Sequence, residues 1–79
     1  MVQILLFASL AQQAGTQSVS WKIESPVTVG QVRGYLQDHV GELPGIENAL
    51  VAVNEEYADQ EVEIKNGDTV AFIPPVSGG

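Results

Sequence analysis

The chain has 79 residues, of which 44% are hydrophobic, and it carries a formal net charge of −7 at pH 7. This length fits one small domain, and the hydrophobic fraction is enough for one core. The absence of cysteine excludes disulfides, thiolate nucleophiles and iron–sulfur clusters, and it fits a cytoplasmic location. The charge argues against binding nucleic acid and favours a basic protein partner, although acidity can also serve solubility alone.

The first residues alternate in polarity as a β-strand does. In residues 2–7, the even-numbered apolar side chains fall on one face and Leu5 and Phe7 fall on the other. This apolar run follows no basic region and is too short to span a membrane, so we expect neither a signal peptide nor membrane association. Ser9 and Gln12 then match a capping box for a short helix through residue 14, closed by Gly15.

A second strand and the main helix follow. Residues 18–24 alternate between polar and apolar side chains, which predicts a strand with one solvated face. Thr28 and Gln31 match a capping box, and Gly41 stands at the expected end of the helix. Gly30 and Gly34 are expected to let this helix lie close against a sheet. One face of the helix is apolar: Val29, Val32, Tyr35, Leu36 and Val40.

The second half of the chain reads as strands and turns. Residues 50–53 predict a third strand, 54–56 a turn, and 57–64 one or two short edge strands. Asn66-Gly67-Asp68 is a strong turn signal before a last strand at 69–73. This order predicts an α+β fold of the β-grasp type, as in ubiquitin, with a mixed sheet of four to five strands and one main helix on one face. The predicted domain covers residues 1–75, and 76–79 form a flexible C-terminal tail.

Strand parity also predicts an apolar patch. In the last strand, Ala71 and Ile73 point away from the helix. If the first and last strands pair, these two side chains join Leu5 and Phe7 on the open face of the sheet. A contiguous exposed apolar area often marks a protein interface, unless a loop or edge strand covers it.

Other candidate groups have simpler explanations. His39 is the only histidine, and since a metal site needs several ligands we expect it to be structural or on the surface, with no bound metal. The acidic pairs Glu55-Glu56 and Glu61/Glu63 fit solvated edge charges rather than matched catalytic carboxylates. Two aromatic residues on apolar faces are expected in the core: Trp21 and Tyr35. The chain is therefore a poor candidate for an enzyme that acts alone.

The sequence closes on Gly78-Gly79. Such a tail can enter a channel too narrow for other residues, because glycine has no Cβ. The alternative is an ordinary frayed terminus. With no competing reactive group, we expect the terminal carboxylate to be the reactive one.

Three segments carry a resemblance to a known family. They are Leu5-Leu-Phe-Ala8, Val51-Ala-Val-Asn54 and Gly67-Asp-Thr-Val-Ala-Phe-Ile-Pro-Pro-Val-Ser-Gly-Gly79. Together they resemble the small, sulfur-carrying subunit of molybdopterin synthase, from end to end. The last segment is the most specific, since a terminal Pro-Pro-Val-Ser/Thr-Gly-Gly typifies that family. Its relatives include thiamine-pathway sulfur carriers and ubiquitin-like proteins.

The resemblance implies a defined chemistry. An activating enzyme that uses ATP and magnesium would join the Gly79 carboxylate to AMP, and a sulfur donor would convert the acyl-adenylate to a thiocarboxylate. The large synthase subunit, expected to form a heterotetramer with this chain, would then accept the tail. Sulfur would pass to cyclic pyranopterin monophosphate. The chain itself would bind no cofactor.

The resemblance also assigns roles to residues. Gly79 would bear the sulfur, and Val76, Ser77 and Gly78 would thread the partner's active site. Pro74-Pro75 would stiffen the exit from the sheet, because proline fixes φ and donates no hydrogen bond. The partner interface would include these two prolines with Leu5, Phe7, Ala71 and Ile73. The family often has Arg-Glu where this chain has Ala11-Gln12, so an arginine contact to the large subunit would be missing here.

Three alternatives stay open at this stage. A sulfur carrier for thiamine or another thio-compound would use the same tail chemistry with a different acceptor, although the Pro-Pro pair argues against it. A ubiquitin-like conjugation tag would be joined to lysines through Gly79. A plain binding module would use the apolar patch and would not need the terminal glycines.

Overall fold

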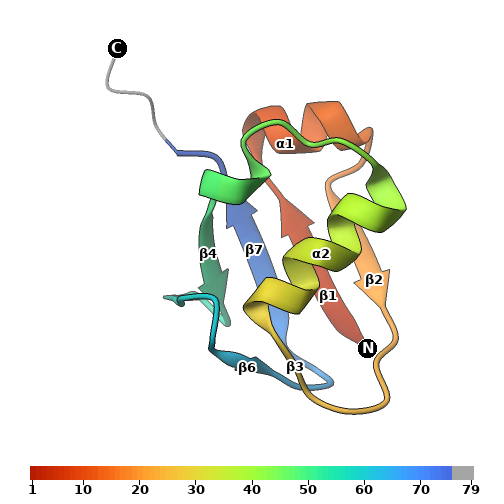
Figure 1. Ribbon diagram of the computed structural model, residues 1–79, viewed down its shortest axis with the longest axis vertical. Coiled ribbons are helices and arrows are strands. Elements are labelled where there is room, and N and C mark those ends of the chain that lie inside the picture. The colour runs from red at the N-terminus through yellow and green to blue at the C-terminus, as the bar shows by residue number, and fades with distance from the viewer. Residues whose placement is uncertain (76–79) are drawn as a thin grey trace.

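A mixed five-stranded sheet organises the protein, whose computed structural model describes residues 1–75. The strand order is β2-β1-β7-β4-β5, and β1 and β7 are parallel while the other pairs are antiparallel (Figure 1). The strands are β1 (Val2–Leu6), β2 (Ser18–Trp21), β4 (Leu50–Val53), β5 (Glu56–Tyr57) and β7 (Thr69–Ile73). A two-stranded sheet pairs β3 (Val27–Thr28) with β6 (Glu63–Ile64). The helices are α1 (Ala8–Ala14), α2 (Val29–Val40) and the 3₁₀ helix η1 (Ile46–Asn48).

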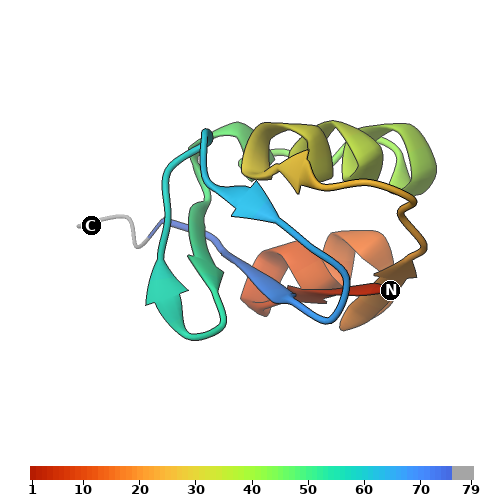
Figure 2. The same cartoon turned by 90° about the horizontal axis from the view of Figure 1, so that it is seen from below.

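The core lies between the five-stranded sheet and α2. Figure 2 shows α2 and the β3–β6 pair on one side of the sheet, and no helix of the described residues on the opposite side. The inward side chains of β1 and β7 are fully buried or nearly so, and helix α2 contributes Val29, Val32 and Leu36 to the same cluster. The predicted β-grasp fold, with one main helix on one face, is confirmed.

The first and last strands pair as their parity predicted. Leu5 and Ala71 are register partners, as are Leu6 and Phe72. Both strands alternate between buried and half-buried side chains. Strict alternation puts one set of side chains in the core and the other on the opposite face. This register therefore fixes which residues face outward.

The start of α2 has the predicted capping box. The Thr28 hydroxyl accepts a hydrogen bond from the Gln31 backbone N–H at 3.2 Å, and the Gln31 side-chain oxygen accepts one from the Thr28 N–H at 2.8 Å. These bonds satisfy donors that the first helical turn leaves free. Gly41 ends the helix as predicted, with φ at 93°.

The predicted capping residue of α1, Ser9, is wrong. The helix begins at Ala8, with Phe7 at the cap position and no side-chain capping bond, so Ser9 lies inside the first turn. The Phe7 N–H donates to the Phe72 carbonyl at 3.2 Å, and the Phe7 carbonyl accepts from the Leu10 N–H. Sheet pairing therefore sets where this helix starts. Gly15 closes the helix in the left-handed conformation, as expected.

The expectation for the two helix glycines is also wrong. The Gly30 N–H donates to the Gln60 carbonyl at 3.1 Å, and a Cβ built at Gly30 would have Gln60 as its nearest neighbour. Helix α2 thus approaches the segment before β6, not the five-stranded sheet, at this position. A Cβ at Gly34 would meet no atom within 4 Å, so nothing in residues 1–75 requires a glycine there.

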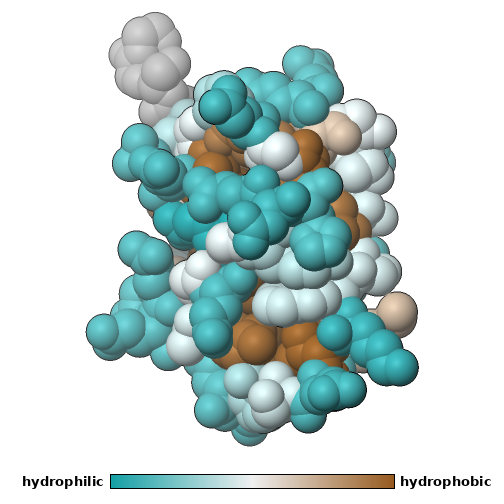
Figure 3. All heavy atoms as spheres, turned by 45° about the vertical axis from the view of Figure 1, so that its right-hand side comes forward, coloured by the Kyte–Doolittle hydropathy of each residue, from teal (hydrophilic) through white to brown (hydrophobic). Residues whose placement is uncertain are grey.

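The face that carries α2 and β2 is mainly hydrophilic. In Figure 3, hydrophilic residues cover most of this side, and brown hydrophobic areas emerge in separate places above and below. None of the helices described in residues 1–75 has the length and apolar character needed to cross a membrane.

Candidate functional site

The open face of the sheet carries two rows of outward apolar side chains. Register partners across four strands form the first row, and Ile73 opposite Leu50 forms the second, with Phe7 beside it at the end of β1. We call this set the sheet-face patch: Leu5, Phe7, Leu50, Ala52, Tyr57, Ala71 and Ile73. Three of these side chains are exposed, with Phe7 at 45%, Leu50 at 47% and Tyr57 at 77% of full exposure. No helix of residues 1–75 covers the patch (Figure 2).

The structure brings together the four patch residues that the sequence predicted and adds three more. Leu50, Ala52 and Tyr57 come from β4 and β5, because β4 pairs with β7. The alternation of Leu50 and Ala52 with buried Val51 was visible in the sequence. The position of β4 beside β7 was not, since strand order depends on pairing between residues far apart in the chain.

The patch lies at the root of the C-terminal segment. Strand β7 ends at Ile73 within the patch, and the chain then passes through half-buried Pro74 and exposed Pro75. The residues predicted to form the tail (Val76, Ser77, Gly78 and Gly79) lie outside the described residues. A partner that covers the sheet-face patch would therefore contact the chain directly before those four residues.

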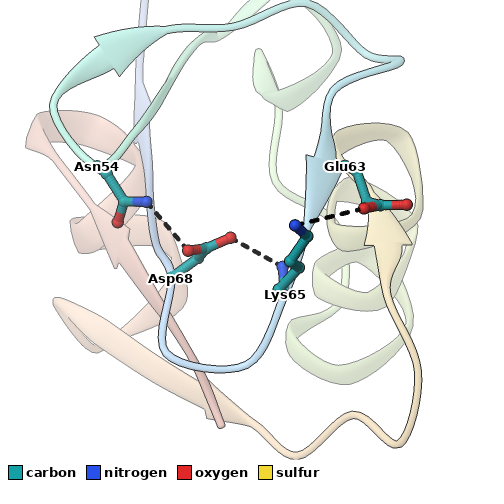
Figure 4. A network of polar contacts seen from close by, with 4 residues as sticks. All are labelled: Asn54, Glu63, Lys65 and Asp68. Carbon is teal, nitrogen blue, oxygen red and sulfur yellow. Dashed lines mark hydrogen bonds and ion pairs between the residues drawn. The ribbon is translucent and has the colours of Figure 1, made fainter.

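Asp68 organises the turn that leads into β7. One carboxylate oxygen accepts the Lys65 backbone N–H at 2.8 Å, and the other accepts the Asn54 side-chain amide at 3.0 Å (Figure 4). Asn54 in turn accepts the Thr69 N–H with its side-chain oxygen at 3.0 Å. The Lys65 bond, and then the Asn54 bond, lower the pKa of Asp68 below its ordinary value. The network joins the β4–β5 turn to the start of β7.

Asp68→Asn is expected to lower stability in a pH-dependent way. The folded-state pKa is depressed, so the carboxylate contributes stability above about pH 4, and this contribution is lost as pH falls through the lower folded value. At pH 7 the variant should be less stable by about 1 kcal/mol, since it loses charge-assisted hydrogen bonds. Urea unfolding of both proteins at pH 7 and in acid would measure the difference.

The matched control for that experiment is Glu24→Gln. It removes one exposed carboxylate that makes no hydrogen bond or ion pair within residues 1–75. The difference in free energy of unfolding between wild type and Asp68→Asn should be smaller in acid than at pH 7. The free energy of unfolding of Glu24→Gln should equal that of wild type at both pH values. An Asp68→Asn gap that stays constant from neutral to acid pH would contradict the role assigned to the carboxylate.

The other candidate groups are placed away from the patch. Trp21 and Tyr35 stack with ring centroids 4.1 Å apart and pack against the core while remaining half-buried. His39 stacks on the other side of Tyr35 at 4.0 Å and is exposed. The three rings join β2 to α2.

The acidic pairs lie on the surface of the described chain. Glu61 and Glu63 are exposed, and Glu63 forms a 3.9 Å ion pair with Lys65 in which both side chains are largely solvated. Such a pair contributes little to stability. Residues 1–75 contain no group of three or more His, Cys, Asp or Glu side chains placed to hold a metal ion.

Comparison with known proteins decides the family. The model of the ThiS family matches residues 4–79, which include all residues of the sheet-face patch and the last four residues. The chain belongs to the ThiS family. The predicted membership of the sulfur-carrier group is thereby confirmed.

Two curated relatives of this ThiS-family chain carry the same name. The chain is 33% identical over 81 residues to the molybdopterin synthase sulfur carrier subunit of Dictyostelium discoideum, covering 98% of this chain and 94% of that protein. It is 30% identical over 82 residues to the protein of the same name in Homo sapiens, covering 99% and 93%. The similarity thus runs along the full length of both chains.

A solved structure with the same fold belongs to a protein with a different name. The crystal structure of small archaeal modifier protein 1 from Haloferax volcanii has a TM-score of 0.80 and 31% identity, covering 99% of this ThiS-family chain and 98% of that one. The same fold therefore occurs in a relative whose name differs from that of the curated proteins.

Proposed function

We propose that this protein is the sulfur carrier subunit of molybdopterin synthase, working in the cytoplasm. The observation that carries the proposal is the full-length similarity, at about 30% identity, to curated proteins of that name. The sheet-face patch supports it, because a carrier without catalytic groups needs a docking surface beside its reactive end.

In this proposal the chemistry occurs at the Gly79 carboxylate. Its oxygen attacks the α-phosphorus of ATP on the activating enzyme, which releases pyrophosphate and leaves an acyl-adenylate. Hydrosulfide supplied by the donor then attacks the acyl carbon, the C–S bond forms as the C–O bond to AMP breaks, and loss of the proton leaves a thiocarboxylate. Magnesium and ATP belong to the activating enzyme, and the carrier supplies the carboxylate and the surface that positions it.

The large synthase subunit then receives the tail. The thiocarboxylate sulfur attacks a carbon of cyclic pyranopterin monophosphate that carries oxygen, so a C–S bond forms as a C–O bond breaks and the oxygen leaves with the electron pair. Water then hydrolyses the thioester between carrier and pterin, which leaves the sulfur on the pterin and restores the Gly79 carboxylate. Two such transfers supply the two sulfurs of the dithiolene. Residues Val76 to Gly78 thread the partner's active site, and Pro74 and Pro75 restrict the direction in which the chain leaves β7.

Intact mass spectrometry tests the first half of this scheme. Incubation with the activating enzyme, ATP, magnesium and a sulfur source should raise the mass by the difference between one sulfur and one oxygen atom. Omitting ATP is the control and should leave the mass unchanged. If activating enzymes that load other sulfur carriers produce no shift, the proposal is wrong.

A second candidate is a ubiquitin-like protein modifier. The likeness to small archaeal modifier protein 1, at a TM-score of 0.80 and 31% identity, favours it specifically. The same acyl-adenylate would then be attacked by a lysine amine of a target protein, forming an amide and releasing AMP. A ladder of covalent conjugates on immunoblots would support the modifier, whereas molybdopterin formation with the large subunit would support the carrier.

A further inference from the structure

The sheet-face patch has a hollow at its centre. Ala52 and Ala71 are register partners and form its floor with small side chains, while Leu5 and Phe7 form one wall. At the other end the lining changes to polar groups from Thr69 and the β4–β5 turn. The hollow has a volume of about 500 Å³, so a long side chain of a partner can enter it.

The polar end of the hollow carries one carboxylate without an ion partner. The Asn54 side chain already donates to Asp68 and accepts from Thr69. Glu55 is exposed and lies at the rim, and it makes no ion pair within residues 1–75. Its neighbour Glu56 does not line the hollow.

The cations of the chain are all elsewhere. Lys22 follows β2, and Lys65 pairs with Glu63. Arg33 on α2 donates to the Glu47 carbonyl at 2.7 Å, with its guanidinium over the Phe72 ring on the helix side of the sheet. None of these cations lines the hollow, so a cation that pairs with Glu55 there would come from another molecule.

We propose that the hollow receives an arginine side chain of the partner protein. The aliphatic stem would lie over Ala52 and Ala71, and the guanidinium would pair with Glu55 at the polar end of the hollow, away from Phe7. A purely apolar side chain would instead cover the Glu55 carboxylate without a hydrogen-bond partner, which is costly. Arginine fits better than lysine because its planar guanidinium forms two parallel hydrogen bonds to a carboxylate.

The inference rests on the proposed function, in which the partner is the large subunit of molybdopterin synthase. The net charge of −7 attracts a basic surface. The arginine–Glu55 pair would then fix the orientation of that surface on the patch, since apolar contacts alone are not directional. A fixed orientation would point β7, and the residues that follow it, into the partner.

Calorimetric titration of the purified large subunit with wild type, Glu55→Gln and Glu56→Gln tests the charge. Both variants remove one negative charge from adjacent positions, but only Glu55 lines the hollow. At low salt Glu55→Gln should weaken binding about tenfold, and Glu56→Gln less than twofold. The effect of Glu55→Gln should shrink at high salt, whereas a purely structural role would leave the salt dependence of wild type and variant the same.

Ala71→Leu tests the space. Its side chain points away from the core, so thermal unfolding should stay close to wild type, and the filled hollow should weaken binding at least about tenfold. Equal affinities for Glu55→Gln and Glu56→Gln would overturn the inference and leave the proposed function standing. So would tighter binding by Glu55→Gln together with weaker binding by Ala71→Leu, which would identify an apolar occupant. Failure of wild type to bind the large subunit would overturn both proposals.

Discussion

Deleting Gly78 and Gly79 is expected to abolish sulfur transfer while leaving the fold intact. The carboxylate would then sit on Ser77, too short by two residues, or about 7 Å of extended chain, to reach the same point in the partner. Reconstitution with the activating enzyme, the sulfur source and the large subunit should yield no molybdopterin. Intact mass should show no replacement of oxygen by sulfur.

The stability of the truncated chain is expected to equal that of wild type. Among residues 1–75, the members of the buried core cluster run from Val2 to Phe72, and we expect this core to form without the last two residues. Thermal unfolding of the two proteins should therefore coincide. Undiminished activity of the truncated chain would contradict the carrier and would favour a binding module that uses only the sheet-face patch.

Gly79→Ala is the matched control for the deletion. It keeps the chain length and the carboxylate and adds one methyl group. If the tail must pass a narrow channel, this variant should still bind the large subunit but transfer sulfur much more slowly than wild type. Normal transfer by Gly79→Ala would show that length and charge, rather than the missing Cβ, are what the partner selects.

Local patterns in the sequence predicted most of the sheet face and its strands. The last strand was predicted with its exact bounds, and the parity of β1 and β7 placed Leu5 and Ala71 on the open face. The β-turn before β7 followed from Asn66-Gly67-Asp68, in which Gly67 takes the positive φ that the turn requires. These features depend on neighbours in the chain, and sequence patterns report such neighbours directly.

The remaining features depend on residues far apart in sequence. The Ser9 capping box was wrong because Phe7 continues the sheet by bonding to Phe72, 65 positions later, and so determines the helix start. The hollow was not predicted, because its floor requires Ala52 and Ala71 to be register partners. The position of Glu55 at the rim of the hollow depends on the same pairing of β4 with β7. No short-range pattern contains that information.

Phe72→Ala and Phe7→Ala form a matched pair with opposite expected consequences. Phe72 is fully buried in β7, in register with Leu6 on one side and Val51 on the other. Its truncation should cost about 3–5 kcal/mol through lost burial and a cavity. A domain of this size has only about 4–12 kcal/mol of stability, so the melting temperature should fall by about 15 °C or more.

Phe7→Ala removes the same atoms from the surface, where the ring is 45% exposed. Its free energy of unfolding should change by less than about 1 kcal/mol, because much of the ring already contacts water. Its affinity for the large subunit should fall at least about tenfold, since exposed aromatic side chains at the centre of an interface contribute strongly to binding. Wild-type affinity in Phe7→Ala would remove the sheet-face patch as the docking surface. A loss of stability as large as that of Phe72→Ala would mean that Phe7 belongs to the core. The combination of an intact fold with lost binding is expected only if the inward and outward faces of β1 and β7 serve stability and recognition separately.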